Sequence, residues 1–151
     1  TDCLKPGGLM RIGLFSELAR QHIVKIRKEI SHAGIGSSEE EMKSFRDTLI
    51  GSKKDHHEKI LNFSDFYSLS ELKDLLFHVQ EYRFTVPQIK VHLDELGLKF
   101  CGFETKEIVS HFQQTNTEKG DLYDLNRWQA YEESNPRTFG RMYQFWCQKV
   151  D

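Results

Sequence analysis

Apolar residues come first in a short run from Leu9 to Phe15, directly after a Pro-Gly-Gly turn at residues 6–8. Proline fixes φ near about −65°, and glycine accepts the positive φ that a tight turn often requires. The run has the length and composition of a buried strand. A helical pattern follows over residues 17–31, with Ser16 as its N-cap. The chain is therefore expected to open on a strand-to-helix unit of an α/β sheet.

Three Ser- or Thr-led motifs with Glu or Gln three residues later predict the starts of further helices. The motif at residues 38–41 begins a helix with Met42, Phe45 and Leu49 facing inward. The motif at 68–71 begins a short helix that runs to Val79. The motif at 85–88 begins a helix that ends before Gly97, with Leu96 in its apolar stripe.

Alternation of apolar and polar residues over 98–104 predicts a strand, with Phe100 on one face and Cys101 and Phe103 on the other. Helices are expected over 106–114 and 122–134. The aromatic tail over 139–150 favours a final strand, with a helix as the alternative.

Composition narrows the function classes for these 151 residues. The net charge of −2 gives no bulk electrostatic case for nucleic acid or an anionic membrane. The sequence contains no apolar run near the roughly 20 residues that span a bilayer, and no signal peptide. Cys3, Cys101 and Cys147 are too scattered for a disulfide framework or a zinc site, and the two in predicted strands are expected to be core thiols. A cytoplasmic protein is expected.

Three segments in order carry a family resemblance. "GGLMRIGLFSELAR" (residues 7–20), "DFYSLSELKDLLFHVQEYRFT" (65–85) and "NPRTFGRMYQFW" (135–146) resemble a bacterial group of class I S-adenosylmethionine-dependent methyltransferases often joined to tetratricopeptide-repeat segments. The resemblance covers essentially all 151 residues. In this comparison the strand at 9–15 resembles the fifth strand of that fold and the strand at 98–104 resembles the sixth. The tail resembles the antiparallel seventh strand.

This resemblance implies an α/β fold that is the C-terminal part of a Rossmann-like methyltransferase sheet. Residues 1–151 would be one partial domain, with 31–83 as a helical insertion that covers the substrate side. S-adenosylmethionine would be bound by an N-terminal half that this sequence lacks, because Gly7-Gly8 and Gly34/Gly36 form no glycine-rich loop after a strand. The expected partners are that half or a tetratricopeptide-repeat segment, and a methyl acceptor that the fold does not identify. Nucleic acid is the least expected acceptor.

Polar and aromatic residues near the short helices are the candidate chemistry. His78 or Glu81 could act as the base that methyl transfer to oxygen or nitrogen requires, and Arg20, Tyr67 and Arg83 could bind substrate. The alternatives are a helix-ending His78, a surface ion pair of Glu81 with Arg83, a packed Tyr67 and an exposed Arg20.

Two further predictions concern a metal site and protein partners. The neighbouring His56 and His57 are expected to diverge on a helix and to be solvated, so no metal site is predicted. The aromatic C-terminus supports a competing function class, a non-catalytic interaction module that docks or forms a homodimer through uncovered sheet surface.

Overall fold

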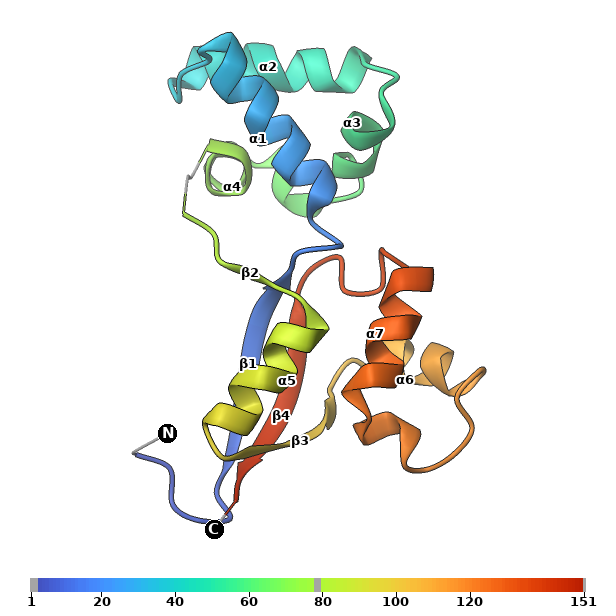
Figure 1. Ribbon diagram of the computed structural model, residues 1–151. Coiled ribbons are helices and arrows are strands. Elements are labelled where there is room, and N and C mark those ends of the chain that lie inside the picture. The colour runs from blue at the N-terminus through green and yellow to red at the C-terminus, as the bar shows by residue number, and fades with distance from the viewer. Residues whose placement is uncertain (1–2, 78–79, 151) are drawn as a thin grey trace. The chain divides into compact units, whose positions relative to one another are not determined.

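The computed structural model describes residues 3–77 and 80–150. Two compact units form, and each is described by itself. Thr1–Ala19 with Tyr82–Asp151 makes a unit that contains a β-sheet, and Arg20–Glu81 makes a helical unit (Figure 1). The protein is thus mixed α/β, as predicted. None of the helices in the described part of the chain combines the length and the apolar character needed to cross a bilayer.

The sheet holds, among the described residues, four strands: β1 (Leu9–Ser16), β2 (Arg83–Phe84), β3 (Leu98–Phe103) and β4 (Tyr143–Lys149). Their order is β2-β1-β4-β3. β4 is antiparallel to both β1 and β3, whereas β2 runs parallel to β1 and pairs with it only at Phe15 and Ser16. The three strands predicted from the pattern are confirmed. The pattern does not predict β2, which is too short to show an alternation.

The Pro-Gly-Gly turn sets the start of β1. Gly7 has φ of 71°, a value that a side chain would strain. The N–H of Gly8 donates to the carbonyl of Lys5 at 2.8 Å, and Gly7 and Gly8 also exchange backbone hydrogen bonds with Lys149 at the end of β4. The turn therefore extends the pairing of β1 with β4.

The two faces of the β1–β4 pair differ. Met10, Ile12 and Leu14 lie opposite Cys147, Phe145 and Tyr143, and all six pack into the core of this unit. The alternate residues form what we call the open face: Leu9, Arg11, Gly13, Gln144, Trp146 and Gln148. Leu9 is 59% exposed and Trp146 39%.

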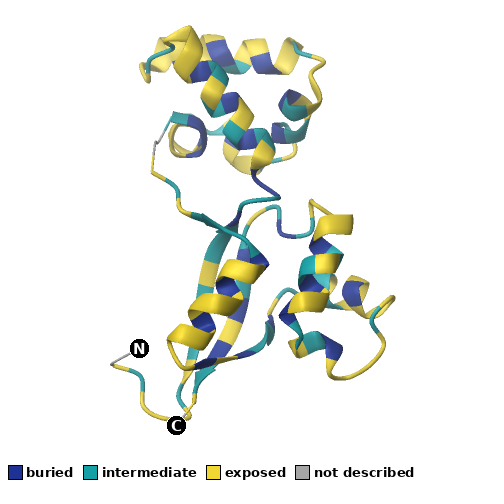
Figure 2. Cartoon of the chain, viewed as in Figure 1, coloured by how far each residue is buried: buried dark blue, intermediate teal, exposed yellow. Residues whose placement is uncertain are grey.

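Helices cover the core face: α5 (Val86–Glu95), α6 (Lys106–Gln113) and α7 (Leu125–Ser134), with a 3₁₀ turn, η3 (Asp121–Tyr123), before α7. The capping box of Thr85 with Gln88 is present, which confirms the predicted start of α5. Leu96 is half exposed, so its place in the predicted apolar stripe is wrong. Figure 2 shows α5 with both buried and exposed positions, as expected of a helix packed on one side.

A bulge in β3 corrects the predicted alternation. The register with β4 shifts between Phe100 and Gly102, so Cys101 is the extra residue. Phe103 therefore turns back to the side of Phe100, and both rings are buried, with centroids 5.1 Å apart. Cys101 is only half buried, whereas Cys147 lies fully in the core, where burial raises the pKa of its thiol.

Aromatic rings fill this core. Phe112 stacks on Trp128 with ring centroids 3.7 Å apart, and Phe139 packs on Tyr143 at 4.7 Å. The predicted aromatic C-terminus is thus mostly core, because its Trp128, Phe139, Tyr143 and Phe145 are at most 1% exposed. Trp146 is the exception, since it points to the open face.

The helical unit has its own core. Its helices are α1 (Gln21–Ala33), α2 (Glu39–Gly51), α3 (Asp55–Ile60) and α4 (Leu69–Leu72), with a 3₁₀ turn η1 (Ser64–Tyr67) and a π-turn η2 (Lys73–Phe77). The capping box of Ser38 with Glu41 is present and Met42, Phe45 and Leu49 are buried, as predicted. Isoleucines of α1 pack against Phe45 and Leu49, together with residues of α3 and the turns that follow.

Two helix starts differ from the prediction. α1 begins at Gln21, not at Glu17, and Ser16 is not its N-cap. The Ser16 hydroxyl instead accepts the N–H of Ala19 in a turn at 3.0 Å and binds a distant carboxylate. Ser68 makes no capping bond, and its hydroxyl lies 3.3 Å from that of Ser70. α4 lasts only one turn before it widens into η2.

Candidate functional site

A buried ion-pair cluster joins the first and last residues of the helical unit. Arg20 binds Glu81 through two hydrogen bonds, Nε to Oε1 at 2.9 Å and Nη2 to Oε2 at 2.7 Å. Arg27 on α1 donates from Nη2 to the same Oε2 at 3.2 Å. The side chains of Arg20 and Glu81 are 7% and 6% exposed. Arg27 also donates to the carbonyl of Leu75, so the cluster fixes α1, η2 and the end of the unit together.

This geometry bears on two predicted site residues. Arg20 is buried, so the exposed helix position considered for it is wrong. Both carboxylate oxygens of Glu81 accept charge-assisted hydrogen bonds from guanidinium groups. These hydrogen bonds hold Glu81 against Arg20 and α1, which is a structural role. A catalytic role for Glu81 and substrate binding by Arg20 stay predictions.

The other predicted residues have separate surroundings. Tyr67, in η1, is 60% exposed and donates its hydroxyl to the carbonyl of Leu61 at 3.0 Å. Arg83, on β2, donates from Nε to Glu17 Oε2 at 2.9 Å, and both side chains are partly exposed. His78 lies outside the described residues. Substrate binding by Tyr67 and Arg83, and catalysis by His78, stay predictions.

A buried carboxylate network lies at the carboxyl end of β1. The Ser16 hydroxyl donates to Glu132 Oε1 at 2.6 Å, and the Tyr143 hydroxyl donates to Oε2 at 2.7 Å. All three residues are at most 4% exposed. Sequence reasoning missed this network because its members lie on β1, α7 and β4. The one available signal is Glu132 itself, an acidic residue one turn beyond the buried Trp128 on the same helix.

Burial raises the pKa values of two groups in this network, Glu132 and Tyr143. Burial raises the pKa of Glu132 above its ordinary value of 4.5, and the bonds from Ser16 and Tyr143 only partly oppose that rise. Burial also raises the pKa of Tyr143 far above its usual range. The site therefore holds a proton more tightly than an exposed carboxyl does, and Tyr143 remains a hydrogen-bond donor at every ordinary pH.

Two histidines contradict their predicted solvation. His57 is 3% exposed, and the rings of His56 and His57 meet with centroids 4.4 Å apart. Both rings reach the Glu29 carboxylate on α1, at 2.8 Å and 2.6 Å. They converge because α1 packs against α3 and brings that carboxylate between them.

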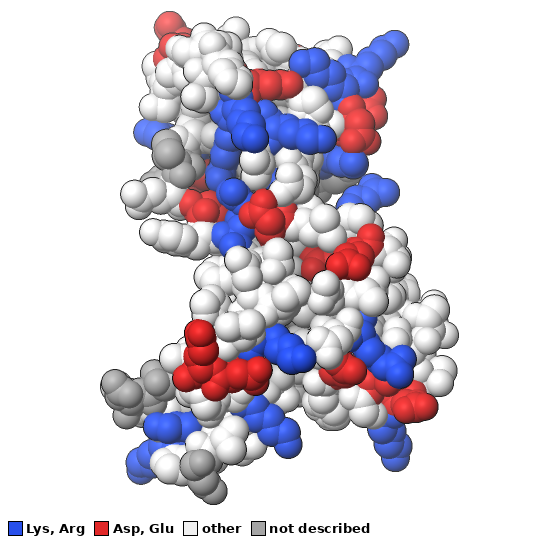
Figure 3. All heavy atoms as spheres, in the orientation of Figure 1, with Lys and Arg blue, Asp and Glu red and all other residues white. Residues whose placement is uncertain are grey.

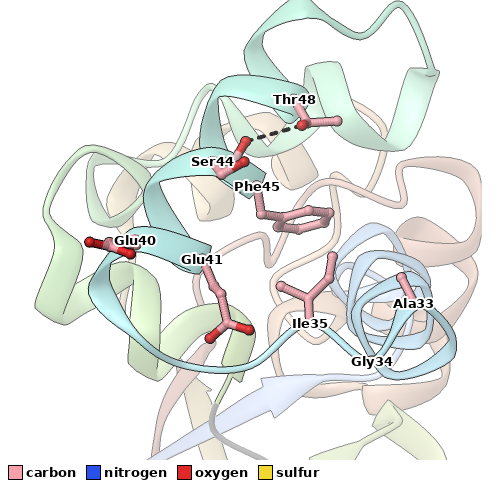
Figure 4. A pocket seen from close by; sticks show the side chains of 8 residues that line it. All are labelled: Ala33, Gly34, Ile35, Glu40, Glu41, Ser44, Phe45 and Thr48. Atoms are coloured by element: carbon pink, nitrogen blue, oxygen red, sulfur yellow. Dashed lines mark hydrogen bonds between the residues drawn. The ribbon is translucent and has the colours of Figure 1, made fainter.

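A shallow surface hollow of about 510 Å³ lies between the end of α1 and the start of α2 (Figure 4). Its floor includes Ile35 and Phe45, which belong to the core of the helical unit. Glu41 on its rim is already bound by Ser38 and by the N–H of Gly36, and Ser44 accepts at its carbonyl from Thr48. The hollow includes none of the predicted site residues that the structure describes. It adds no candidate for catalysis.

Both signs of charge occur in each unit on the face drawn in Figure 3, consistent with the net charge of −2. A scan against protein-family models and a search of curated proteins find no match for this chain.

Proposed function

We propose that the chain is the C-terminal part of a class I S-adenosylmethionine-dependent methyltransferase, in which it supplies the sheet edge and part of the substrate-side cover. The observation that carries the proposal is the direction of the strands. β4 comes last in the chain and is antiparallel to both β1 and β3, so β1 and β3 run parallel to each other. This supports the resemblance, in which an antiparallel seventh strand accompanies the fifth and sixth.

The outer edge of β1 also supports the proposal. Among the described residues, β2 pairs with β1 only at Phe15 and Ser16, which leaves the outer edge of Leu9–Leu14 without a neighbouring strand. Met10, Ile12 and Leu14 along this stretch are only partly buried. A long, partly apolar edge is a template for pairing with another strand. In the proposed enzyme that strand belongs to the N-terminal half.

The positions of the glycines support the expectation that this chain alone binds little S-adenosylmethionine. Of the described residues, Gly7, Gly34, Gly97 and Gly102 have positive φ. Gly7 and Gly97 precede strands, Gly34 follows α1 and Gly102 lies at the bulge, so none of them opens a helix after a strand. A loop of that kind holds the cofactor in such sheets. We expect S-adenosylmethionine to be bound by the N-terminal half.

Two measurements test this function. The reading frame upstream of Thr1 should encode a glycine-rich strand-turn-helix, and the joined product should bind S-adenosylmethionine in calorimetry. The 151-residue chain should give no binding at micromolar concentrations. Micromolar binding by the chain alone, or an upstream frame without that element, would contradict the proposal.

The exposed Trp146 and Leu9 favour a second candidate, a non-catalytic module that dimerises through the open face. Sedimentation of the chain separates the two candidates. A stable dimer that dissociates on Trp146→Ser but not on Tyr82→Ser supports the module, because Tyr82 is equally aromatic and 81% exposed. A monomer supports the enzyme part.

A further inference from the structure

Three side chains of the types that ligate metals meet at the surface of the helical unit. They are Glu29 on α1 and His56 and His57 on α3, and their candidate ligand atoms all lie within 4.8 Å of one another. His56 Nε2 is 2.8 Å from Glu29 Oε1, and His57 Nε2 is 2.6 Å from Oε2. Both histidines thus present the same ring nitrogen to one carboxylate.

The surroundings hold these groups in place. The Ser52 hydroxyl lies 2.8 Å from His57 Nδ1, on the far side of the ring from Glu29. In metal sites a partner on the second ring nitrogen fixes the tautomer and orients the ring, so that the other nitrogen can bind the ion. His57 is nearly fully buried, whereas Glu29 is 33% and His56 19% exposed at the side chain. The cluster is therefore buried on its inner side and open to solvent on its outer side.

We propose that Glu29, His56 and His57 bind a divalent transition-metal ion, with Zn²⁺ as the representative ion and water as the fourth ligand. Two imidazoles and one carboxylate, with an open fourth position, form a donor set that zinc accepts in tetrahedral geometry. Imidazole ligands select zinc and its neighbours over magnesium or calcium, which prefer oxygen. This inference does not depend on the proposed methyltransferase function.

Protons and one lysine compete with the ion. Burial alone would raise the pKa of Glu29, but hydrogen bonds from His56, His57 and Lys54 lower it to about 2. The Lys54 ammonium lies 3.1 Å from Glu29 Oε1 and must move when the ion enters. Metal binding also requires neutral histidines.

The test is a calorimetric titration of Zn²⁺ into the untagged chain at pH 7.5. We expect one ion per chain, and a visible absorption spectrum of tetrahedral type when Co²⁺ replaces Zn²⁺. His56→Ala and Glu29→Gln should each weaken binding roughly tenfold or more, and Lys54→Met should strengthen it. Circular dichroism of each variant confirms that it folds. His57→Ala is less informative because His57 is buried.

Two variants serve as controls. His92→Ala removes an exposed histidine that pairs with Glu95, and Cys3→Ser removes an exposed thiol. Both should bind Zn²⁺ like the parent chain. The proposal is overturned if no stoichiometric binding occurs, if folded Glu29→Gln and His56→Ala variants bind normally, or if either control abolishes binding.

Discussion

Two buried acidic side chains, Glu132 and Glu81, illustrate different solutions to the same physical problem. An ionised carboxylate loses hydration when it is buried, and only partners or protonation can offset that loss. Glu81 is paired with two guanidinium groups, whereas Glu132 has two hydroxyl donors and a raised pKa. Substitutions at the two positions should therefore affect stability differently, with a pH dependence at Glu132 and a coupling energy at Glu81.

At Glu132 the effect depends on pH. Because the folded-state pKa lies above the unfolded value of 4.5, the stabilising contribution is complete below pH 4.5 and is lost as the pH rises through the folded pKa. Glu132→Gln keeps an acceptor for Tyr143 and a donor toward Ser16, and it removes the ionisation. Its melting temperature relative to the parent should rise as the pH increases above 4.5 and level off once the pH exceeds the folded pKa, as measured by thermal unfolding at each pH.

Glu132→Ala is the matched comparison. It leaves two buried hydroxyl groups without their acceptor, which should cost about 1–3 kcal/mol relative to Glu132→Gln at every pH. A Gln variant whose melting temperature follows the pH dependence of the parent would contradict the raised pKa.

At Glu81 the effect should be a large coupling. Glu81→Ala breaks the bonds of two guanidinium groups at once and should cost about 3–5 kcal/mol. Arg20→Ala should cost less than Glu81→Ala, because Arg27 still donates to Glu81. The double variant should cost much less than the sum, as measured by urea unfolding in a double-mutant cycle. Arg83→Ala is the control: its pair with Glu17 is partly exposed and should contribute about 0–1 kcal/mol. Equal effects at Arg20 and Arg83 would contradict this account.

At the scale of elements, two motifs with the same sequence pattern differ in the structure. Ser38 with Glu41 forms a full capping box, whereas Ser68 makes no capping bond. We expect Ser38→Ala to destabilise the chain by about 1 kcal/mol and Ser68→Ala to have little effect. Chemical unfolding of the two variants measures the difference, and a larger loss at Ser68 would contradict the assignment of the caps.

Elements with a local sequence signal could be predicted, whereas features that depend on tertiary pairing could not. The strands at 9–15 and 98–104, the tail strand and the helices begun by Ser38 and Thr85 follow from local periodicity and caps, because their signals lie within one turn or one alternation. The bulge at Cys101, the start of α1 and the strand β2 depend on tertiary pairing. Of the candidate site, the pairing of Arg20 with Glu81 and the convergence of His56 and His57 could not be read from the sequence, because their partners lie 61 and 28 residues away.

At the scale of the whole molecule, the chain contains two separate cores. The sheet unit has a core rich in aromatic rings, and the helical unit buries a mainly aliphatic one that includes Ile23, Ile26 and Leu49 at 0% exposure. Each core is built from residues of one unit alone. Because the helical unit has its own core, its folding can be tested without the rest of the chain.

We expect Arg20–Glu81 to fold when produced alone. Its ends are already joined by the bidentate pair of Arg20 and Glu81, and its described core residues all lie within the unit. Domains of about 60 residues bury only a modest fraction of their surface, so the excised unit should be marginally stable and sensitive to that pair. Far-ultraviolet circular dichroism should show a helical spectrum that melts cooperatively. Arg20→Ala should abolish the transition, while Lys43→Ala, which removes an exposed pair with Glu39, should preserve it. A disordered spectrum for the parent segment would mean that the helical unit depends on the sheet unit for its fold.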